Sequence, residues 1–218
     1  MDRKQVLLDD GQMARQREFT EKIHAMHQAR GRTPLALVDT FGCQQNVADG
    51  EVLMGMLREM GYELTRDENQ ADVILLNTCA IREHAEKRVY GHLGRLSHTK
   101  AAKPDQIICL CGCMAQQKVV ADKVKNSYHH VDLVLGPQAE WRLPELLHEV
   151  YTKNKRVFSI ENEHGRIAED LPIVREGGVR AWVSIMYGCN NFCSYCIVPY
   201  VRGRERSRRA DDILREAE

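Results

Sequence analysis

The sequence lacks an excess of charge of either sign. It contains 31 Lys and Arg residues and 31 Asp and Glu residues, so its formal net charge at pH 7 is zero. No global electric field therefore draws the chain onto nucleic acid or an anionic membrane, and any electrostatic binding site must be local. One local candidate is the segment RGRERSRR, which contains Arg202, Arg204, Arg206, Arg208 and Arg209.

Long apolar runs are also lacking. The N-terminal stretch MDRKQVLLDDGQMARQREF has no uninterrupted apolar core of the kind found in signal peptides. Nor does any stretch approach the roughly 18 to 20 apolar residues that cross a membrane. We therefore expect a cytoplasmic protein with no membrane partner. Hydrophobic residues make up 43% of the chain, which is enough to build a packed globular core.

From Thr33 onward, short apolar runs alternate with amphipathic segments. The runs are almost continuously apolar, which is typical of parallel strands covered by helices on both faces. The pattern predicts an α/β fold with an open, Rossmann- or flavodoxin-like parallel sheet. The predicted strands cover residues 35–40, 71–78, 106–112 and 131–136, and the predicted helices cover residues 47–61, 82–96, 116–126 and 139–151.

Four regions follow from this pattern. Residues 1–32 are polar with apolar positions at loose helical spacing, which indicates a surface helix or an extension. Residues 33–150 form the main domain, and residues 151–179 contain an edge strand, RVFSI, followed by a linker. Residues 180–218 begin a second unit with the apolar run AWVSIMYG and end in a helix over ADDILREAE.

Three dispersed cysteines occupy the same topological position. Cys43, Cys79 and Cys113 each follow a predicted strand and precede a helix. Successive strand-to-helix turns of a parallel sheet share one edge, so these thiols could converge, and helix N-termini stabilise the thiolate that binds metal. The alternative is three unrelated buried cysteines.

Two further cysteines and one asparagine of the same domain have other expected roles. Cys109 and Cys111 lie inside a strand and are expected in the core. Asn46 is expected to cap a helix.

A second cysteine group is local, in the segment CNNFCSYC. Cys189, Cys193 and Cys196 lack the fourth ligand that zinc usually takes, and a disulfide-exchange CxxC motif would use only two of them. An iron–sulfur cubane held by three cysteines leaves one iron open for chemistry. A structural zinc knuckle remains the alternative. Phe192 and Tyr195 either stack on a cofactor or pack the loop, and we expect packing.

The motifs together resemble the radical S-adenosylmethionine methylthiotransferases. CNNFCSYC, followed by IVPYVRGRERSR, resembles the cluster motif of that family, and FGCQQNVADGE, LLNTCAIREHAEKRVYGHLG and CGCMAQ resemble its N-terminal domain. The resemblance covers residues 35–150 and 180–212. It implies an N-terminal methylthiotransferase domain followed by the start of a radical S-adenosylmethionine βα barrel.

The resemblance also implies cofactors and a reaction. Cys189, Cys193 and Cys196 would bind a 4Fe-4S cluster that chelates S-adenosylmethionine and cleaves it to a deoxyadenosyl radical. Cys43, Cys79 and Cys113 would hold an auxiliary 4Fe-4S cluster that carries the sulfur. The sequence most resembles the branch that methylthiolates C2 of N6-isopentenyladenosine beside the tRNA anticodon. Relatives that act on threonylcarbamoyl-adenosine tRNA or on a ribosomal protein remain alternatives.

The expected partners follow from the same resemblance. They are tRNA, whose phosphates or the cofactor carboxylate would meet the five arginines, and an external electron donor of the flavodoxin or ferredoxin type. The protein is expected to be a monomer. A solvated, charge-mixed loop is the alternative for the arginine segment.

The second unit is shorter than the barrel it resembles. Since a full barrel needs about 250 residues, we expect the chain to be the front part of a longer enzyme. Two other classes stay open: an iron–sulfur electron carrier and a zinc-stabilised binding module.

Overall fold

The computed structural model describes residues 7–81, 83–160, 166–175 and 179–218. Its centre is a six-stranded sheet with the order β2-β1-β3-β4-β5-β6. Every neighbouring pair in this sheet is parallel, so the predicted α/β fold is confirmed. The strands are β1 (Leu35–Phe41), β2 (Glu63–Leu64), β3 (Val73–Thr78), β4 (Ile107–Gly112), β5 (Leu133–Leu135) and β6 (Val157–Ser159).

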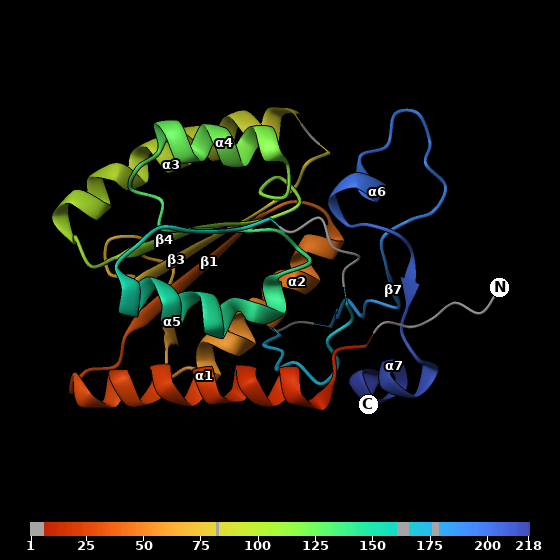
Figure 1. Cartoon of the computed structure of the whole chain (residues 1–218), viewed down its shortest axis with the longest axis horizontal. Coiled ribbons are helices and arrows are strands. Elements are labelled where there is room, and N and C mark those ends of the chain that lie inside the picture. The colour runs from red at the N-terminus through yellow and green to blue at the C-terminus, as the bar shows by residue number, and fades with distance from the viewer. Residues whose placement is uncertain (1–6, 82, 161–165, 176–178) are drawn as a thin grey trace.

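Helices cover both faces of the sheet (Figure 1). One face carries α3 (Glu83–Ala102) and α4 (Lys118–Ser127), and the other carries α2 (Gln44–Glu59) and α5 (Leu143–Lys153), which follows the short 3-10 helix η1 (Glu140–Arg142). Side chains of the central strands alternate between the two apolar cores. Leu75 packs in the core with α2 and α5, whereas Leu76 packs in the core with α3 and α4. Both are fully buried, as expected for strands covered on both faces.

The N-terminal region forms a surface helix, as predicted. Helix α1 (Asp10–Ala29) begins with a capping box in which Asp9 accepts a hydrogen bond from the Gln12 N–H. It lies outside α5 (Figure 1), and Ile23 on its inner side is fully buried. Phe19 contacts the ring of His148 on α5 at 5.2 Å between centroids. Residues 10–29 therefore add a layer to the same core instead of forming a separate unit.

The three central strands end at the same level of the sheet. Phe41 of β1 is paired with Thr78 of β3, and Thr78 is paired with Gly112 of β4. The residues that follow these three ends must therefore lie beside one another at the carboxyl edge. This register positions the candidate site.

The C-terminal segment differs from its prediction. The run 181–188 was expected to form a strand at the start of a barrel, and of this run only β7 (Met186–Tyr187) is a strand. It pairs antiparallel with β8 (Arg206–Ser207), and among the described residues these two strands form a separate two-stranded sheet. The rest of this segment contains α6 (Val198–Val201) and the predicted terminal helix α7 (Ala210–Ala217).

The edges of the main sheet were predicted only in part. The RVFSI strand is confirmed as β6, which pairs with β5 at one edge. The opposite edge strand, β2, was missed because it has only two residues, too few for a recognisable apolar run. Among the described residues, no helix has the length and apolar character needed to span a membrane.

Candidate metal centres

The carboxyl edge of the sheet contains a cavity of about 180 Å³ that is lined by three thiols. Cys43, Cys79 and Cys113 come from the ends of β1, β3 and β4, so the structure brings the three dispersed cysteines together as predicted. The C-terminal segment supplies the opposite wall. Its lining residues include Tyr187, Ile197, Val198, Val201 and Arg202.

Backbone contacts fix the thiol positions. Cys43 is the N-cap residue of α2, so it lies at the positive end of a helix dipole. The Cys79 N–H donates to the Phe41 carbonyl at 3.0 Å, which continues the sheet pairing past the end of β3. Gly112, directly before Cys113, has a φ of 87°, and a Cβ there would lie 2.5 Å from the Thr78 carbonyl oxygen. A glycine is therefore required for the turn that delivers Cys113.

Two buried asparagines, Asn46 and Asn77, form hydrogen bonds that hold this edge of the sheet together. The Asn46 side chain donates to Asn77 Oδ1 at 3.0 Å and to the Thr78 carbonyl at 3.3 Å, while Asn77 Nδ2 donates to the Asn46 carbonyl at 2.7 Å. Cys43 Sγ lies 3.4 Å from Asn46 Oδ1, to which it donates while it is protonated. The prediction that Asn46 caps α2 is wrong, because Cys43 holds the N-cap position and Asn46 lies inside the first turn. Its amide instead ties α2 to β3.

The three thiols differ in acidity. Hydrogen bonding from the Cys79 thiol lowers the pKa of Cys43 to about 5, and burial only partly opposes this effect. The same interaction, together with burial, raises the pKa of Cys79. Burial raises the pKa of Cys113 to about 11, although the Arg202 charge pulls it back down. Cys43 and Cys79 therefore behave as one thiolate–thiol pair in the metal-free chain.

Cys109 and Cys111 lie outside this cavity, as predicted. Both are fully buried in β4 and belong to the core that faces α2 and α5. The Cys111 thiol donates to the Leu76 carbonyl at 3.5 Å. These two cysteines fill the core.

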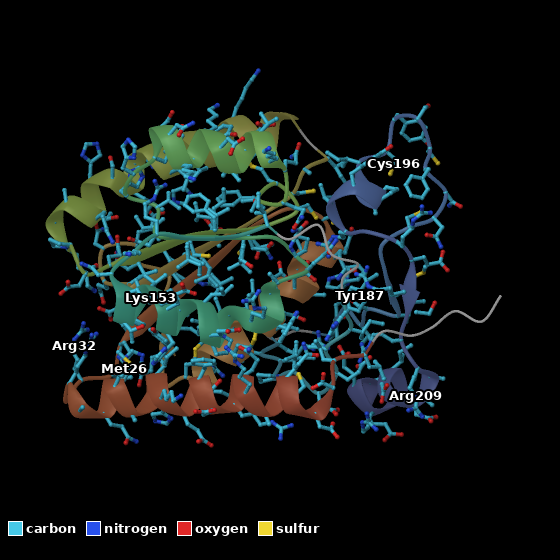
Figure 2. All side chains as sticks on the ribbon, viewed as in Figure 1. Met26, Arg32, Lys153, Tyr187, Cys196 and Arg209 are labelled. Carbon is cyan, nitrogen blue, oxygen red and sulfur yellow. The ribbon has the colours of Figure 1, made fainter. Side chains whose placement is uncertain are left out.

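The second cysteine group lies on the loop between β7 and α6. Cys193 is exposed, whereas Cys189 and Cys196 are half-buried, and the Cys196 N–H donates to the Cys193 carbonyl at 3.0 Å. Figure 2 shows Cys196 on this loop, at the opposite end of the C-terminal segment from Arg209. Phe192 packs as expected, with its ring 6.2 Å from that of Tyr200. The expectation for Tyr195 is wrong, because 90% of this residue is exposed and the loop turns it outward.

The five arginines of the RGRERSRR segment do not form one surface. Arg202 is buried, the Arg206 guanidinium donates to the carbonyls of Arg202 and Arg204, and Arg208 forms ion pairs with Glu169 and Glu216. Only Arg204 and Arg209 are exposed. The expectation of five arginines meeting phosphate therefore does not fit Arg202, Arg206 and Arg208 in this conformation, because intramolecular acceptors already hold them.

Two acidic residues near the cavity were not singled out from the sequence. Asp49 accepts a hydrogen bond from Arg202 Nη2 at 2.5 Å, and Glu140 is a second acidic group near this pair. Burial, and then the nearby Asp49 charge, raises the pKa of Glu140. Burial alone would lower the pKa of Arg202, but Asp49 and Cys113 more than offset this and raise it. Asp49 follows Cys43 closely in the sequence, but no spacing rule distinguishes it from a surface carboxylate.

The thiols surround a space and do not converge on one point. Among the described residues, no group of three or more His, Cys, Asp or Glu side chains is close enough together to hold a single metal ion. The three thiols of the cavity nevertheless form an all-sulfur donor set around about 180 Å³. Iron–sulfur clusters are bound by such thiolates and occupy a volume between them. The donors and the space therefore fit a cluster better than a lone ion.

Together these features define a class of protein: a parallel α/β domain with a thiol-lined cavity at its carboxyl edge, closed by a second segment that carries its own cysteine motif. Comparison with known proteins makes the class specific. Residues 36–136 match the family model described as "Uncharacterized protein family UPF0004".

The chain is also similar to curated enzymes over nearly its whole length. It is 48% identical over 219 residues to the tRNA-2-methylthio-N(6)-dimethylallyladenosine synthase of Acetivibrio thermocellus, covering 99% of this chain and 46% of that protein. It is 48% identical over 195 residues to the synthase of the same name from Staphylococcus saprophyticus, covering 89% of this chain and 38% of that protein. The domain match and the identity over most of the chain confirm the resemblance to the methylthiotransferases seen in the sequence. The chain spans less than half the length of these relatives.

Proposed function

We propose that this chain provides the two cysteine sites of an enzyme that adds a methylthio group to C2 of N6-isopentenyladenosine next to the tRNA anticodon. The observation that carries the proposal is the cavity in which Cys43, Cys79 and Cys113 face the segment that bears the CxxxCxxC motif. The similarity to synthases that modify dimethylallyladenosine in tRNA supports the choice of substrate. Relatives that act on threonylcarbamoyl-adenosine tRNA or on a ribosomal protein are the alternatives.

Each cysteine group has a distinct role in this proposal. Cys43, Cys79 and Cys113 would hold one 4Fe-4S cluster, and Cys189, Cys193 and Cys196 would hold a second that binds S-adenosylmethionine. When bound, these cofactors would supply radical chemistry at an adenine C2–H, which is neither acidic nor attached to a leaving group. The thiols must be deprotonated to serve as ligands. The low pKa of Cys43 favours this, whereas the raised pKa values of Cys79 and Cys113 mean that metal binding must displace their protons.

The apolar wall of the cavity has a protective role. Ile197, Val198 and Val201 lie across from the dispersed thiols and limit the access of water to the space between them. Arg204 and Arg209, the two exposed arginines of the RGRERSRR segment, are the candidates for contacts with tRNA phosphates. An external flavodoxin- or ferredoxin-type electron donor, a monomeric state, a cytoplasmic location and a domain division near residues 150 and 180 complete the proposal.

The proposal is tested by product analysis under reducing, anaerobic conditions. A version of this protein with the length of its relatives should make 5′-deoxyadenosine and methylthiolated isopentenyl-adenosine, both detected by chromatography after digestion of the tRNA. We expect the 218-residue chain to turn over poorly, because it spans under half the length of those relatives. Cys193→Ala should abolish deoxyadenosine formation. Unchanged formation in that variant would contradict the cluster assignment.

Metal analysis separates the rival functions. Redox-active iron and sulfide without any cleavage of S-adenosylmethionine by the longer version would indicate an electron carrier. Zinc without sulfide would indicate a structural binding module. Methylthiolation of a different tRNA nucleoside, or of a ribosomal protein, would keep the family and change the substrate.

A further inference from the structure

Arg202 connects the two parts of the molecule that carry cysteines. It follows α6 in the C-terminal segment, yet its side chain enters the carboxyl edge of the main sheet. There Arg202 Nε donates to Cys113 Sγ at 3.0 Å and Nη2 donates to Asp49 Oδ2 at 2.5 Å. Arg202 is only 8% exposed, and Asp49 is equally buried.

The buried Arg202 guanidinium needs negatively charged hydrogen-bond acceptors around it. Taking an arginine out of water costs several kcal/mol unless opposite charge and hydrogen bonds compensate. Asp49 supplies one negative charge, and the second branch of the guanidinium is directed at a sulfur atom. A neutral thiol is a weak acceptor, whereas a thiolate that binds metal carries charge. A metal-bound Cys113 sulfur would therefore accept this N–H more strongly than the neutral thiol does.

We infer that Arg202 is a positioning residue that couples the two cysteine sites: it donates an N–H···S bond to a sulfur ligand of the dispersed cysteine site, and the same side chain docks the CxxxCxxC segment onto that site. The inference rests on the proposed function, because it requires Cys43, Cys79 and Cys113 to hold a cluster. It adds that the electronic state of this cluster depends on a residue of the C-terminal segment.

The coupling has an electronic consequence and a mechanical one. Hydrogen bonds and positive charge near the sulfurs of an iron–sulfur cluster stabilise its reduced form and raise its reduction potential. Removing Arg202 should therefore lower the potential. The mechanical consequence concerns docking, because the Arg202–Asp49 ion pair holds α6 and the preceding loop against the cavity wall.

The test uses the 218-residue chain reconstituted with iron and sulfide in a Cys193→Ala background, so that only the dispersed cysteines hold a cluster. Arg202→Gln should lower the midpoint potential of the cluster by at least 59 mV, which corresponds to a tenfold change in the equilibrium constant of a one-electron reduction. It should also speed iron loss to a chelator about tenfold. Asp49→Asn keeps the N–H···S bond and removes a negative charge, so it should not lower the potential, while it should raise hydrogen exchange over residues 197–203.

Arg215→Gln is the matched control, because Arg215 is an exposed arginine of the same segment whose ion pairs, among the described residues, are with Asp170 and Asp212. It should leave the potential, iron loss and exchange unchanged. A wild-type potential and rate of iron loss in Arg202→Gln would overturn the inference. If that variant does not fold, Arg202→Lys decides, since a single ammonium keeps the charge but lacks the two separate nitrogens with which Arg202 contacts Asp49 and Cys113. Wild-type iron loss and exchange in Arg202→Lys would equally overturn the inference.

The proposed cluster site is tested separately. Cys79→Ala in the same background should contain no cluster. If it binds as much iron as its parent, the site itself fails. If it loses the iron while Arg202→Gln behaves as wild type, the site stands and only the role of Arg202 is refuted.

Discussion

The two cysteine groups of this chain are built in opposite ways. Cys43, Cys79 and Cys113 are far apart in sequence and lie at the ends of three paired strands, where backbone hydrogen bonds and two buried asparagines hold them. Cys189, Cys193 and Cys196 are close in sequence and lie on a loop, where Cys193 and its neighbour Tyr195 face solvent. The first group takes its geometry from the fold, and the second takes its proximity from the sequence.

The two cysteine groups therefore differ in how rigidly they are held and in how accessible they are to a cofactor. Ligands placed on strand ends share the stability of the whole sheet, so their spacing persists without a bound group. Ligands on an exposed loop can admit a large cofactor, but their arrangement depends on what binds between them. The dispersed site is therefore suited to retain a cluster, and the loop site is suited to expose one to a substrate.

The largest expected effect is on iron content. After anaerobic reconstitution of the 218-residue chain, Cys79→Ala or Cys193→Ala should each remove about one of two clusters. Each group has three cysteines, so either substitution leaves a cluster with only two cysteine ligands. Iron and sulfide analysis with a visible spectrum measures the loss. Cys109→Ala is the control, since Cys109 is buried in the core away from the cavity. A loss of iron from Cys109→Ala equal to that from Cys79→Ala would contradict the distinction between core and ligand cysteines.

The next effect is on stability and compares two glycines. Gly112 precedes Cys113 with a φ of 87°, and Gly188 precedes Cys189 with a φ of 73°. Alanine in either left-handed position costs roughly 1–2 kcal/mol. At Gly112 the added Cβ would also meet the Thr78 carbonyl, which does not move without disturbing the sheet. Gly112→Ala should therefore lower the free energy of unfolding of the sheet by at least that amount.

Gly188→Ala should act only locally. Its Cβ would meet the Arg204 carbonyl, which lies in the turn just before β8. The two tryptophans separate the regions, because Trp141 lies in the 3-10 helix beside the sheet and Trp182 lies in the C-terminal segment. In a Trp182→Phe background, denaturant unfolding followed by Trp141 fluorescence should shift for Gly112→Ala and stay within about 0.5 kcal/mol for Gly188→Ala. Equal shifts would show that the two regions unfold as one unit.

A smaller effect concerns the pH dependence of thiol reactivity in the iron-free, reduced chain. The pKa of Cys43 is lowered to about 5 by the Cys79 thiol, so Cys43 is already a thiolate above about pH 6. Its alkylation rate, followed by mass spectrometry, should change less than twofold between pH 6 and pH 8. Cys79→Ala removes the donor, so the Cys43 rate should then rise steeply with pH. A steep rise in the wild-type chain would rule out the thiol pair.

The same contrast explains what the sequence could and could not predict. Apolar runs with cysteines at their ends were enough to predict the parallel sheet and the meeting of Cys43, Cys79 and Cys113, because strand register is a regular property of the backbone. The pairing of Arg202 with Asp49 depends on how the C-terminal segment docks, which has no periodic signal. The prediction for Asn46 failed for a related reason. Its position in the sequence fits a helix cap, but its side-chain amide donates a hydrogen bond to the buried Asn77 on β3.

The smallest expected effect tests how loosely the loop cysteines are held. Phe192 packs against Tyr200, and the Arg204 guanidinium lies 4.4 Å from its ring centroid, whereas Tyr195 is 90% exposed. A cation–π contact at an exposed site is worth about 0.5–1 kcal/mol, so Phe192→Ala should loosen the loop by about that amount, and Tyr195→Ala should leave it unchanged. Hydrogen exchange over residues 189–197 in the iron-free chain measures the loosening, and the exchange of β3 serves as the internal reference. Equal effects of the two substitutions would mean that Phe192 does not anchor the loop. A change in the exchange of β3 would mean that the loop and the sheet are not separate, and the contrast between the two cysteine groups would then fail.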